Sequence, residues 1–174
     1  MRRVLLTVAL ILVTGPFVFP LGQEGANNNS STKGASVQAQ GSTWTIYTDK
    51  EKYLPSDPII LTFTRRNDTA RSLNFGTPPE IVWVHSLNVT LPNGEPAPPT
   101  LYYHRWDRGV FAGWGGSAPS GFVQTNTVQL DRFFDMTLAG DYRISLRKRL
   151  SEGSTNEIVS PPLTIRVDDS NLKK

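Results

Sequence analysis

The chain has 174 residues, of which 38% are hydrophobic and 19% charged, with 14 glycines, 13 prolines and no cysteine. This length allows one ordinary domain plus an appendage, and the composition favours a turn-rich all-β domain over a helical one. The lack of cysteine excludes disulfides, thiol catalysis and Cys-based zinc sites, so the core must be held together by burial alone.

The first residues have the pattern of a secretory signal. Arg2 and Arg3 precede an apolar run from Val4 to Val13, which continues with an interruption to Phe19. A basic start followed by such a run is typical of a signal peptide, which we assign to residues 1–21. We therefore expect an exported protein that is periplasmic, on the cell surface or extracellular. An uncleaved membrane anchor is the alternative, although the run is shorter than the roughly 20 residues that a spanning helix needs.

Most of the formal net charge of +3 belongs to this leader. The sequence Val37-Gln38-Ala39 fits the small-residue rule for signal cleavage. A cut there removes Arg2, Arg3 and Lys33 from the 18 basic residues and Glu24 from the 15 acidic ones, which leaves 15 against 14, or +1. We therefore expect no nucleic-acid partner.

Residues 22–42 are rich in Asn, Ser, Gly, Gln and Ala and have almost nothing to bury, which predicts a disordered linker. The folded domain is expected to span residues 43–168, followed by a polar tail at 169–174. Inside the domain, the sequences beginning at Asn67 and Asn88 match the acceptor pattern for N-glycosylation.

Two alternating segments open the domain. Trp44 and Ile46 share one face of the first segment, and Leu61 and Phe63 share one face of the second, after the turn Pro55-Ser56-Asp57-Pro58. A period of two predicts two strands, each with one buried face.

Apolar residues alternate again from Glu80 to Leu91, which predicts another strand. Trp83 is its candidate core tryptophan, and His85 falls on the same face, where we interpret it as a hydrogen-bonded core residue rather than a ligand. A turn at Asn93-Gly94 follows, and we predict a further short strand from Leu101 to Trp106.

Residues 105–121 combine five glycines with three large aromatic side chains. Glycine makes a regular element costly, and a long loop in a small domain is usually functional or disordered. We therefore predict a loop in which Trp106, Phe111 and Trp114 form the candidate binding surface, because tryptophan is common in binding hot spots. The alternative is a lid that folds back on the domain and buries these side chains.

The segment after Gly140 predicts the strand around which the domain is organised. Tyr142, Ile144, Leu146 and Leu150 are assigned to its inner face, and the arginines between them to a solvated outer face. We expect the Tyr142 hydroxyl to hydrogen-bond the preceding turn. A last strand is predicted over residues 158–167, with its prolines at an edge.

The arrangement of Tyr142 just after Gly140 resembles the tyrosine corner of immunoglobulin-like sandwiches. The opening around Pro55-Ser56-Asp57-Pro58 resembles the start of bacterial immunoglobulin-like and macroglobulin-like modules. The resemblance covers residues 44–68 and 128–168. It implies an all-β, immunoglobulin-like antiparallel β-sandwich of about 7 to 8 strands, and it is more specific for fold than for function.

Catalytic patterns are weak. The sequence has no nucleophile elbow, zinc-protease helix or phosphate-binding glycine loop. His85 and His104 occur among many serines, so a Ser-His-Asp set has little specificity, and a metal site would need both histidines with Asp107. Local capping explains Asp131 and Asp135 more simply than glycoside hydrolysis does. We expect no enzyme activity, no cofactor and no metal.

Two functions follow from the sequence. The first is an exported, non-enzymatic immunoglobulin-like domain with a structural or protein-interaction role at the cell envelope or outside the cell. The alternative is a carbohydrate-binding module that uses residues 105–121. The expected partner is a protein or a glycan, and a membrane is involved only through an uncleaved N-terminal segment. Trp83, Gly140 and Tyr142 are assigned structural roles.

Overall fold

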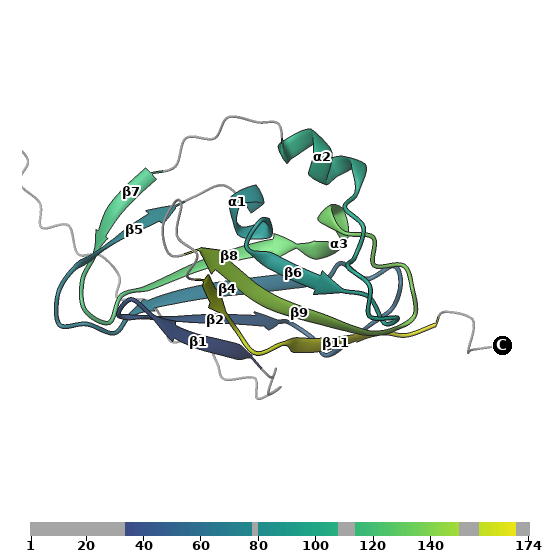
Figure 1. Cartoon of the computed structure of the whole chain (residues 1–174), viewed down its shortest axis with the longest axis horizontal. Helices are drawn as coiled ribbons and strands as arrows, with labels where there is room; N and C mark the ends of the chain where they lie inside the picture. Colours follow the sequence, from purple (N-terminus) through teal and green to yellow (C-terminus); the bar gives the residue numbers. More distant parts are fainter. Residues whose placement is uncertain (1–33, 78–79, 108–113, 150–156, 170–174) are drawn as a thin grey trace, which may run out of the picture. The chain divides into compact units, whose positions relative to one another are not determined.

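The computed structural model describes residues 34–77, 80–107, 114–149 and 157–169. These residues form an all-β sandwich of two sheets, with an additional two-stranded ribbon and three short helices (Figure 1). The predicted all-β sandwich is therefore confirmed. These ranges contain eleven strands, more than the predicted seven to eight. Seven of the eleven are only two to five residues long, which is too short for a clear alternation in the sequence. The predicted signal peptide lies outside the described residues.

The first sheet is antiparallel throughout and has the order β1-β2-β4-β8. Its strands are β1 (Ala35–Ala39), β2 (Ser42–Thr48), β4 (Ile60–Asn67) and β8 (Val123–Gln129). Trp44, Ile46, Leu61 and Phe63 are buried on its inner face, as their alternation predicts.

The second sheet is built around β9 (Gly140–Arg149). It also contains β6 (Leu87–Thr90), β10 (Glu157–Val159), β11 (Leu163–Val167) and β3 (Lys52–Tyr53), the last of which runs parallel to β11. The strand predicted over 158–167 is divided into β10 and β11 at Pro161-Pro162, since proline has no N–H for a sheet ladder. Leu150 lies outside the described residues. The buried residues of β9 and β11 include all the other predicted inward ones: Tyr142, Ile144, Leu146, Leu163, Ile165 and Val167.

A separate antiparallel ribbon pairs β5 (Leu73–Thr77) with β7 (Trp114–Ala118). The prediction of a loop over residues 105–121 is therefore wrong at 114–118. Gly115 and Gly116 lie opposite Gly76 and Phe75 in the ribbon. Pairing with β5 satisfies the backbone of this glycine-rich segment, so it forms a strand although it has few side chains to pack.

Three short helices replace predicted strands or loops: α1 (Glu80–Val84), α2 (Leu101–Asp107) and α3 (Leu130–Phe133). The strands predicted at 80–84 and 101–106 are therefore wrong. Short apolar runs fit a helix as well as a strand. At α2, the Tyr103 N–H donates to the Thr100 hydroxyl at 3.3 Å, which is an N-cap. At α1, Val82, Trp83 and Val84 are consecutive apolar residues, which breaks the alternation of a strand.

The first sheet begins earlier than predicted. Residues 35–39 form β1, so the linker predicted over 22–42 is wrong from residue 35 onward; residues 22–33 lie outside the described residues. Gln40 and Gly41, with φ of 49° and 71°, make the two-residue turn into β2, as in a type I′ hairpin. Ala35 is buried in the core, so β1 belongs to the sandwich.

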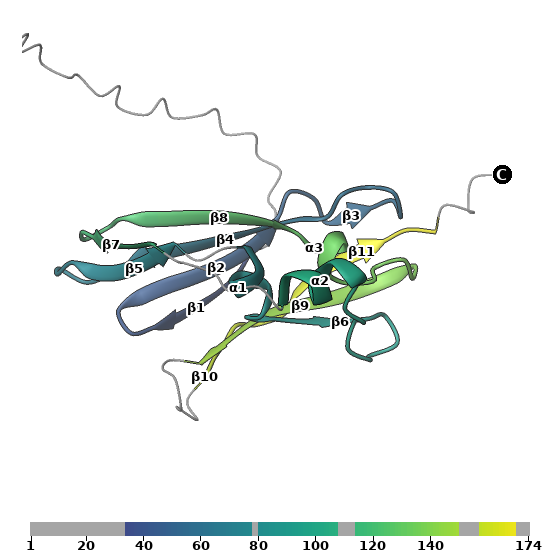
Figure 2. The ribbon, with the colours of Figure 1, turned by 90° about the horizontal axis from the view of Figure 1, so that it is seen from above.

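The helices lie along one side of the sandwich, between the edge strands β8 and β6 (Figures 1 and 2). Trp83 of α1 is buried there, with ring centroids 5.3 Å from Phe63 and 6.1 Å from Trp44. Trp83 is therefore a core tryptophan, although it is carried by a helix. Within the described ranges, no helix has the length and apolar character needed to cross a membrane.

Candidate functional site

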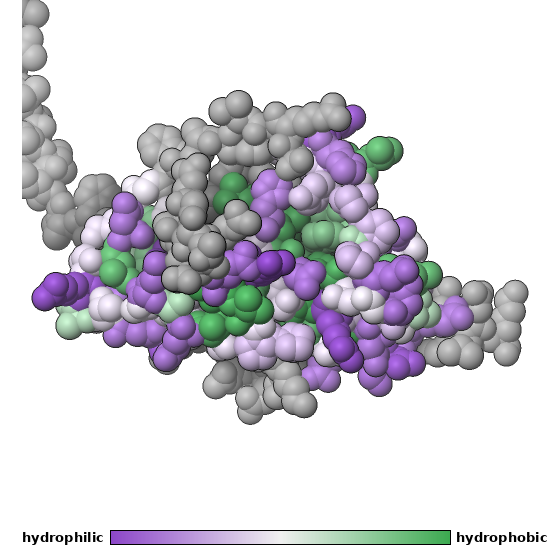
Figure 3. All heavy atoms as spheres, viewed as in Figure 1, coloured by the Kyte–Doolittle hydropathy of each residue, from purple (hydrophilic) through white to green (hydrophobic). Residues whose placement is uncertain are grey.

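The first candidate site is an aromatic surface on α2. Leu101 is 89% exposed and Trp106 is 42% exposed. The Tyr102 ring lies between Trp106, with centroids 5.9 Å apart, and the buried Phe133, at 5.0 Å. The Arg132 guanidinium carbon lies 4.3 Å from the Tyr102 centroid. We call Leu101, Tyr102, Trp106 and Arg132 the α2 surface; Figure 3 shows a small hydrophobic area among hydrophilic residues at this end of the molecule.

Helix α2 is anchored to the core through Tyr102, which also belongs to the α2 surface, and through Tyr103. Tyr102 packs edge-on against Phe133, and Tyr103 lies 6.2 Å from Phe134 and 5.6 Å from His85. These contacts fix the helix while leaving Leu101 and Trp106 on the outside. Of the three side chains predicted to bind, the structure therefore exposes Trp106; Phe111 lies outside the described residues and Trp114 begins β7.

The residues considered for catalysis or metal binding do not assemble. His85 is exposed, so its predicted core position is wrong; α1 ends at Val84 and the chain turns outward there. Asp135 accepts the Thr137 N–H at 3.2 Å within its own turn, as predicted. Asp131 instead accepts the N–H of the distant Ile59 at 2.8 Å, so it joins α3 to the residue before β4 and does not cap locally. Among the described residues, no three His, Cys, Asp or Glu side chains come close enough to hold a metal ion.

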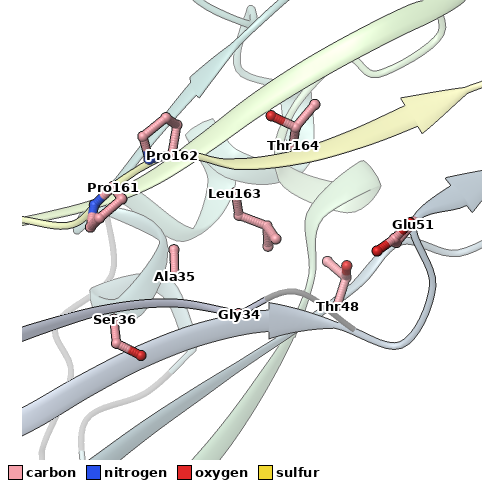
Figure 4. Close-up of a pocket in the computed structure, with 9 residues that line it drawn as sticks. All are labelled: Gly34, Ala35, Ser36, Thr48, Glu51, Pro161, Pro162, Leu163 and Thr164. Carbon is pink, nitrogen blue, oxygen red and sulfur yellow. The ribbon is translucent and has the colours of Figure 1, made fainter. Parts of the chain in front are cut away.

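A hollow of about 420 Å³ lies on the opposite side of the sandwich, between β1 and β11 (Figure 4). Ala35 and Leu163 point into it from the two sheets. Two of its hydroxyl groups have structural partners: Ser36 bonds Thr45 at 2.8 Å, and Thr48 donates to the Lys50 carbonyl at 2.7 Å. This hollow is therefore a seam between the sheets and offers little chemistry.

A second candidate site lies at one end of the core, where two basic side chains pack against aromatic rings. The Lys148 ammonium of β9 lies 4.8 Å from the Trp44 centroid and 5.4 Å from that of Trp83. The Arg65 guanidinium carbon of β4 lies 4.6 Å from Trp44 and 3.8 Å from Phe75. We call Lys148, Arg65, Trp44, Trp83 and Phe75 the cationic end cluster.

Electrostatics make this cluster unusual. Desolvation, followed by the nearby positive charge of Arg65, lowers the pKa of Lys148, and burial lowers the pKa of Arg65. Both cations are only partly buried, so each keeps some of its hydration. The cation–π contacts, worth about 0.5–2 kcal/mol each, offset part of the hydration that is lost.

The sequence contained a signal for this cluster. In β9 the inner face carries Tyr142, Ile144 and Leu146, so strict alternation also places Lys148 inside. Arg65 follows Phe63 in the same way in β4. Interpreting the basic residues of β9 as one solvated face hid the inward lysine.

No protein-family model matches the chain, and no curated protein matches it in sequence. Its function is therefore inferred from the geometry and chemistry of these two sites.

Proposed function

We propose that this chain is an exported, non-enzymatic immunoglobulin-like module that binds a protein partner through the α2 surface. The leader pattern at residues 1–21 supports export. The two antiparallel-rich sheets and the hydrogen bond from the Tyr142 hydroxyl to the Leu138 carbonyl, 2.9 Å long, support the immunoglobulin-like assignment. The structural roles of Asp131 and Asp135 support a binding function over a catalytic one.

The observation that carries the proposal is the exposure of Leu101 and Trp106 on one short, well-anchored helix. A rigid aromatic side chain gives a large contact area at a small entropic cost, and hot spots favour tryptophan and arginine. Arg105 and Arg132 lie on α2 and α3 together with Asp107 and Asp131, so this end of the molecule carries charges of both signs. The fitting partner is a protein that presents an apolar side chain to Leu101 and Trp106.

Site-specific photocrosslinking tests this surface. The full chain, produced in its own cells, carries a photoreactive residue at the exposed position 105, which keeps Trp106, or at the control position Val159, which is 56% exposed on β10. We expect a discrete crosslinked protein from position 105 that is lost when Leu101→Ser is added. No product, or the same product from position 159, contradicts the proposal.

The alternative is a carbohydrate-binding module that uses Trp106. Sugar rings stack on exposed aromatic side chains, and Trp106 is 42% exposed. Tyr102 is a poor second platform, because Arg132 lies over its ring and Phe133 meets its ring at 74°. Glycan binding by the purified protein that is abolished by Trp106→Ala would favour this alternative. Binding that is absent, or unchanged in Trp106→Ala, excludes the Trp106 platform.

A further inference from the structure

We propose that a hollow at one end of the sandwich binds a lysine or arginine side chain of a partner polypeptide. The hollow lies between residues 54–59, which precede β4, residues 98–100, which precede α2, and residues 131–137, which begin within α3. We call it the acidic hollow. Its residues are distinct from those of the α2 surface, so this second docking site goes beyond the proposed function.

Hydrogen bonds between these three segments preform the hollow. The Asp135 N–H donates to the Pro98 carbonyl at 2.9 Å, and the Leu130 N–H donates to the Ile59 carbonyl at 2.8 Å. The Asp131 carboxylate in turn accepts the Ile59 N–H at 2.8 Å. A partner therefore meets walls that are already in place, and little conformational entropy is lost when it binds.

The hollow has room for a side chain, and its walls are largely apolar. Its volume is about 400 Å³, within the range of ligand-binding pockets. Phe134 and Met136 line it and are only 9% and 5% exposed, whereas Leu54, Pro98 and Pro99 line it from exposed positions. The alkyl stem of a basic side chain packs on such apolar surface while its charged head stays near water.

The charged residues that line the hollow within the described ranges are all aspartates: Asp57, Asp131 and Asp135. Asp131 has a structural role. One of its oxygens accepts the Ile59 N–H, and the other accepts the Gln129 side-chain amide at 2.9 Å. The other two aspartates are therefore the ones that can receive a ligand.

Asp57 and Asp135 each keep one carboxylate oxygen for a ligand. Oδ2 of Asp57 accepts the Leu54 N–H and contacts the Lys50 ammonium, both at 3.2 Å. Oδ1 of Asp135 accepts the N–H and the hydroxyl of Thr137. In the described part of the chain, the second oxygen of each carboxylate has no hydrogen-bond partner. Three carboxylates beside one ammonium leave a negative excess, which an incoming ammonium or guanidinium group complements.

The surroundings of the hollow favour a polypeptide over a small amine. Thr100 and Thr137 line the hollow, and the residues that follow them, Leu101 and Leu138, are 89% and 50% exposed. These leucines extend the apolar surface beyond the hollow. A polypeptide with a basic side chain in the hollow covers them with its neighbouring apolar residues, whereas a small amine does not reach them.

The probe for this site is a pentapeptide with a lysine between two leucines, blocked at both ends and titrated into the full chain by NMR and calorimetry. The control peptide carries acetyl-lysine, which keeps the stem and removes the charge. Asp57→Asn and Asp135→Asn each remove one charge, and asparagine still accepts the hydrogen bonds of the turns. Asp68→Asn is the matched control, because Asp68 is exposed just beyond the other end of β4.

We expect saturable binding of the lysine peptide, with chemical-shift changes at Leu54, Thr100 and Thr137. Acetyl-lysine and each of the two hollow variants should weaken binding about tenfold, since a hydrogen bond to a charged group is lost. Asp68→Asn should leave the affinity unchanged. No saturable binding, equal binding of the acetyl-lysine peptide, or equal weakening in Asp68→Asn overturns the proposal. The comparison of the two peptides uses the unmodified chain, so it holds even where a variant does not fold.

Two further outcomes assign the hollow to another occupant and also overturn the proposal. Binding of n-butylammonium as tight as that of the peptide identifies a site for small amines. A concentration-dependent dimer of the chain that Asp135→Asn dissociates identifies a second copy as the occupant. None of these outcomes bears on the crosslinking test of the α2 surface, since the two sites share no residue.

Discussion

At the scale of single residues, the corner before β9 depends on two side-chain properties. Tyr142 is buried, and its hydroxyl donates to the Leu138 carbonyl four residues upstream. Burial raises the pKa of Tyr142, so the hydroxyl remains a donor to a higher pH than that of a solvent-exposed tyrosine. Gly140 has φ of +134°, and a Cβ there would lie 2.7 Å from Pro92. The corner therefore requires both a tyrosine and a glycine.

Replacing Tyr142 by Phe removes the hydroxyl and leaves the ring. We expect the free energy of unfolding to fall by about 1–3 kcal/mol, because the Leu138 carbonyl loses its donor. Urea unfolding of the purified domain measures this change. Tyr102→Phe is the control and should change stability by less than about 0.5 kcal/mol, since Tyr102 is only half-buried. A change near zero for Tyr142→Phe would show that the hydrogen bond from Tyr142 to Leu138 does not stabilise the fold.

These residues were predictable for different reasons. Tyr142 and Gly140 carry a local signal, a tyrosine after a glycine turn, so the sequence sufficed. To predict that Lys148 points inward, the strand register has to be followed even though burying a charge is costly. Its basic neighbours suggested a solvated face instead. The partners of Lys148, Trp44 and Trp83, lie about 100 and 65 positions earlier in the chain, a distance over which no local pattern operates.

At the scale of elements, Asn67 connects the end of β4 to the ribbon. Its side-chain nitrogen donates to the carbonyls of Ala118 at 2.8 Å and Arg71 at 2.7 Å, and its oxygen accepts the Thr69 N–H at 2.9 Å. Asn67 is completely buried. The acceptor sequence that begins at Asn67 is therefore closed to glycosylation in the folded chain, whereas Asn88 is exposed.

The change Asn67→Asp keeps the shape and replaces the donor by an oxygen that faces two carbonyls. We expect stability to fall by about 1–3 kcal/mol for each buried group left without a partner. Asn88→Asp on β6 is the matched control and should have little effect. Thermal and urea unfolding measure both. Equal stabilities of the two variants would show that Asn67 does not tie the ribbon to the sandwich.

The sequence predicted strands better than it predicted helices. Strands with one buried face, such as β2, β4, β9 and β11, follow a period of two and were found. Helices α1 and α2 are five and seven residues long, too short to show a helical period. The Thr100 cap of α2 was available in the sequence, but aromatic residues in the helix favoured a strand. The sequence therefore predicted a candidate surface around Trp106, but it predicted a strand and loop there instead of the helix α2.

At the scale of the whole domain, the raised pKa values of two buried tyrosines predict how stability changes at alkaline pH. Burial, together with a 2.6 Å hydrogen bond to Asp49, raises the pKa of Tyr53, and burial raises that of Tyr142. In the unfolded chain both phenols titrate near pH 10. As pH rises above about 10, the unfolded chain loses protons that the folded chain keeps, so the stability conferred by both groups declines. The pKa of Lys148 is lowered in the folded chain, so this group makes the free energy of unfolding rise with pH. It is one group, and the two tyrosines act against it.

We therefore expect the free energy of unfolding to decrease between about pH 9 and about pH 11.5. Tyr53→Phe removes the group with the largest shift and should flatten this slope. Urea unfolding across the range provides the measurement, with Tyr102→Phe as the control that keeps the slope. A stability that rises with pH, or a slope that Tyr53→Phe does not alter, contradicts this assignment.

The position of β1 bears on where the leader of the proposed exported protein can be cleaved. The sequence Val37-Gln38-Ala39, which fits a signal-cleavage rule, lies inside this strand, where its backbone pairs with β2. Cleavage after Ala39 would leave β2 as an unprotected sheet edge, the kind of edge that promotes aggregation, and would also remove the buried Ala35. A processed protein that keeps this sheet must therefore be cut upstream of Gly34, so the fold itself narrows the choice of processing site.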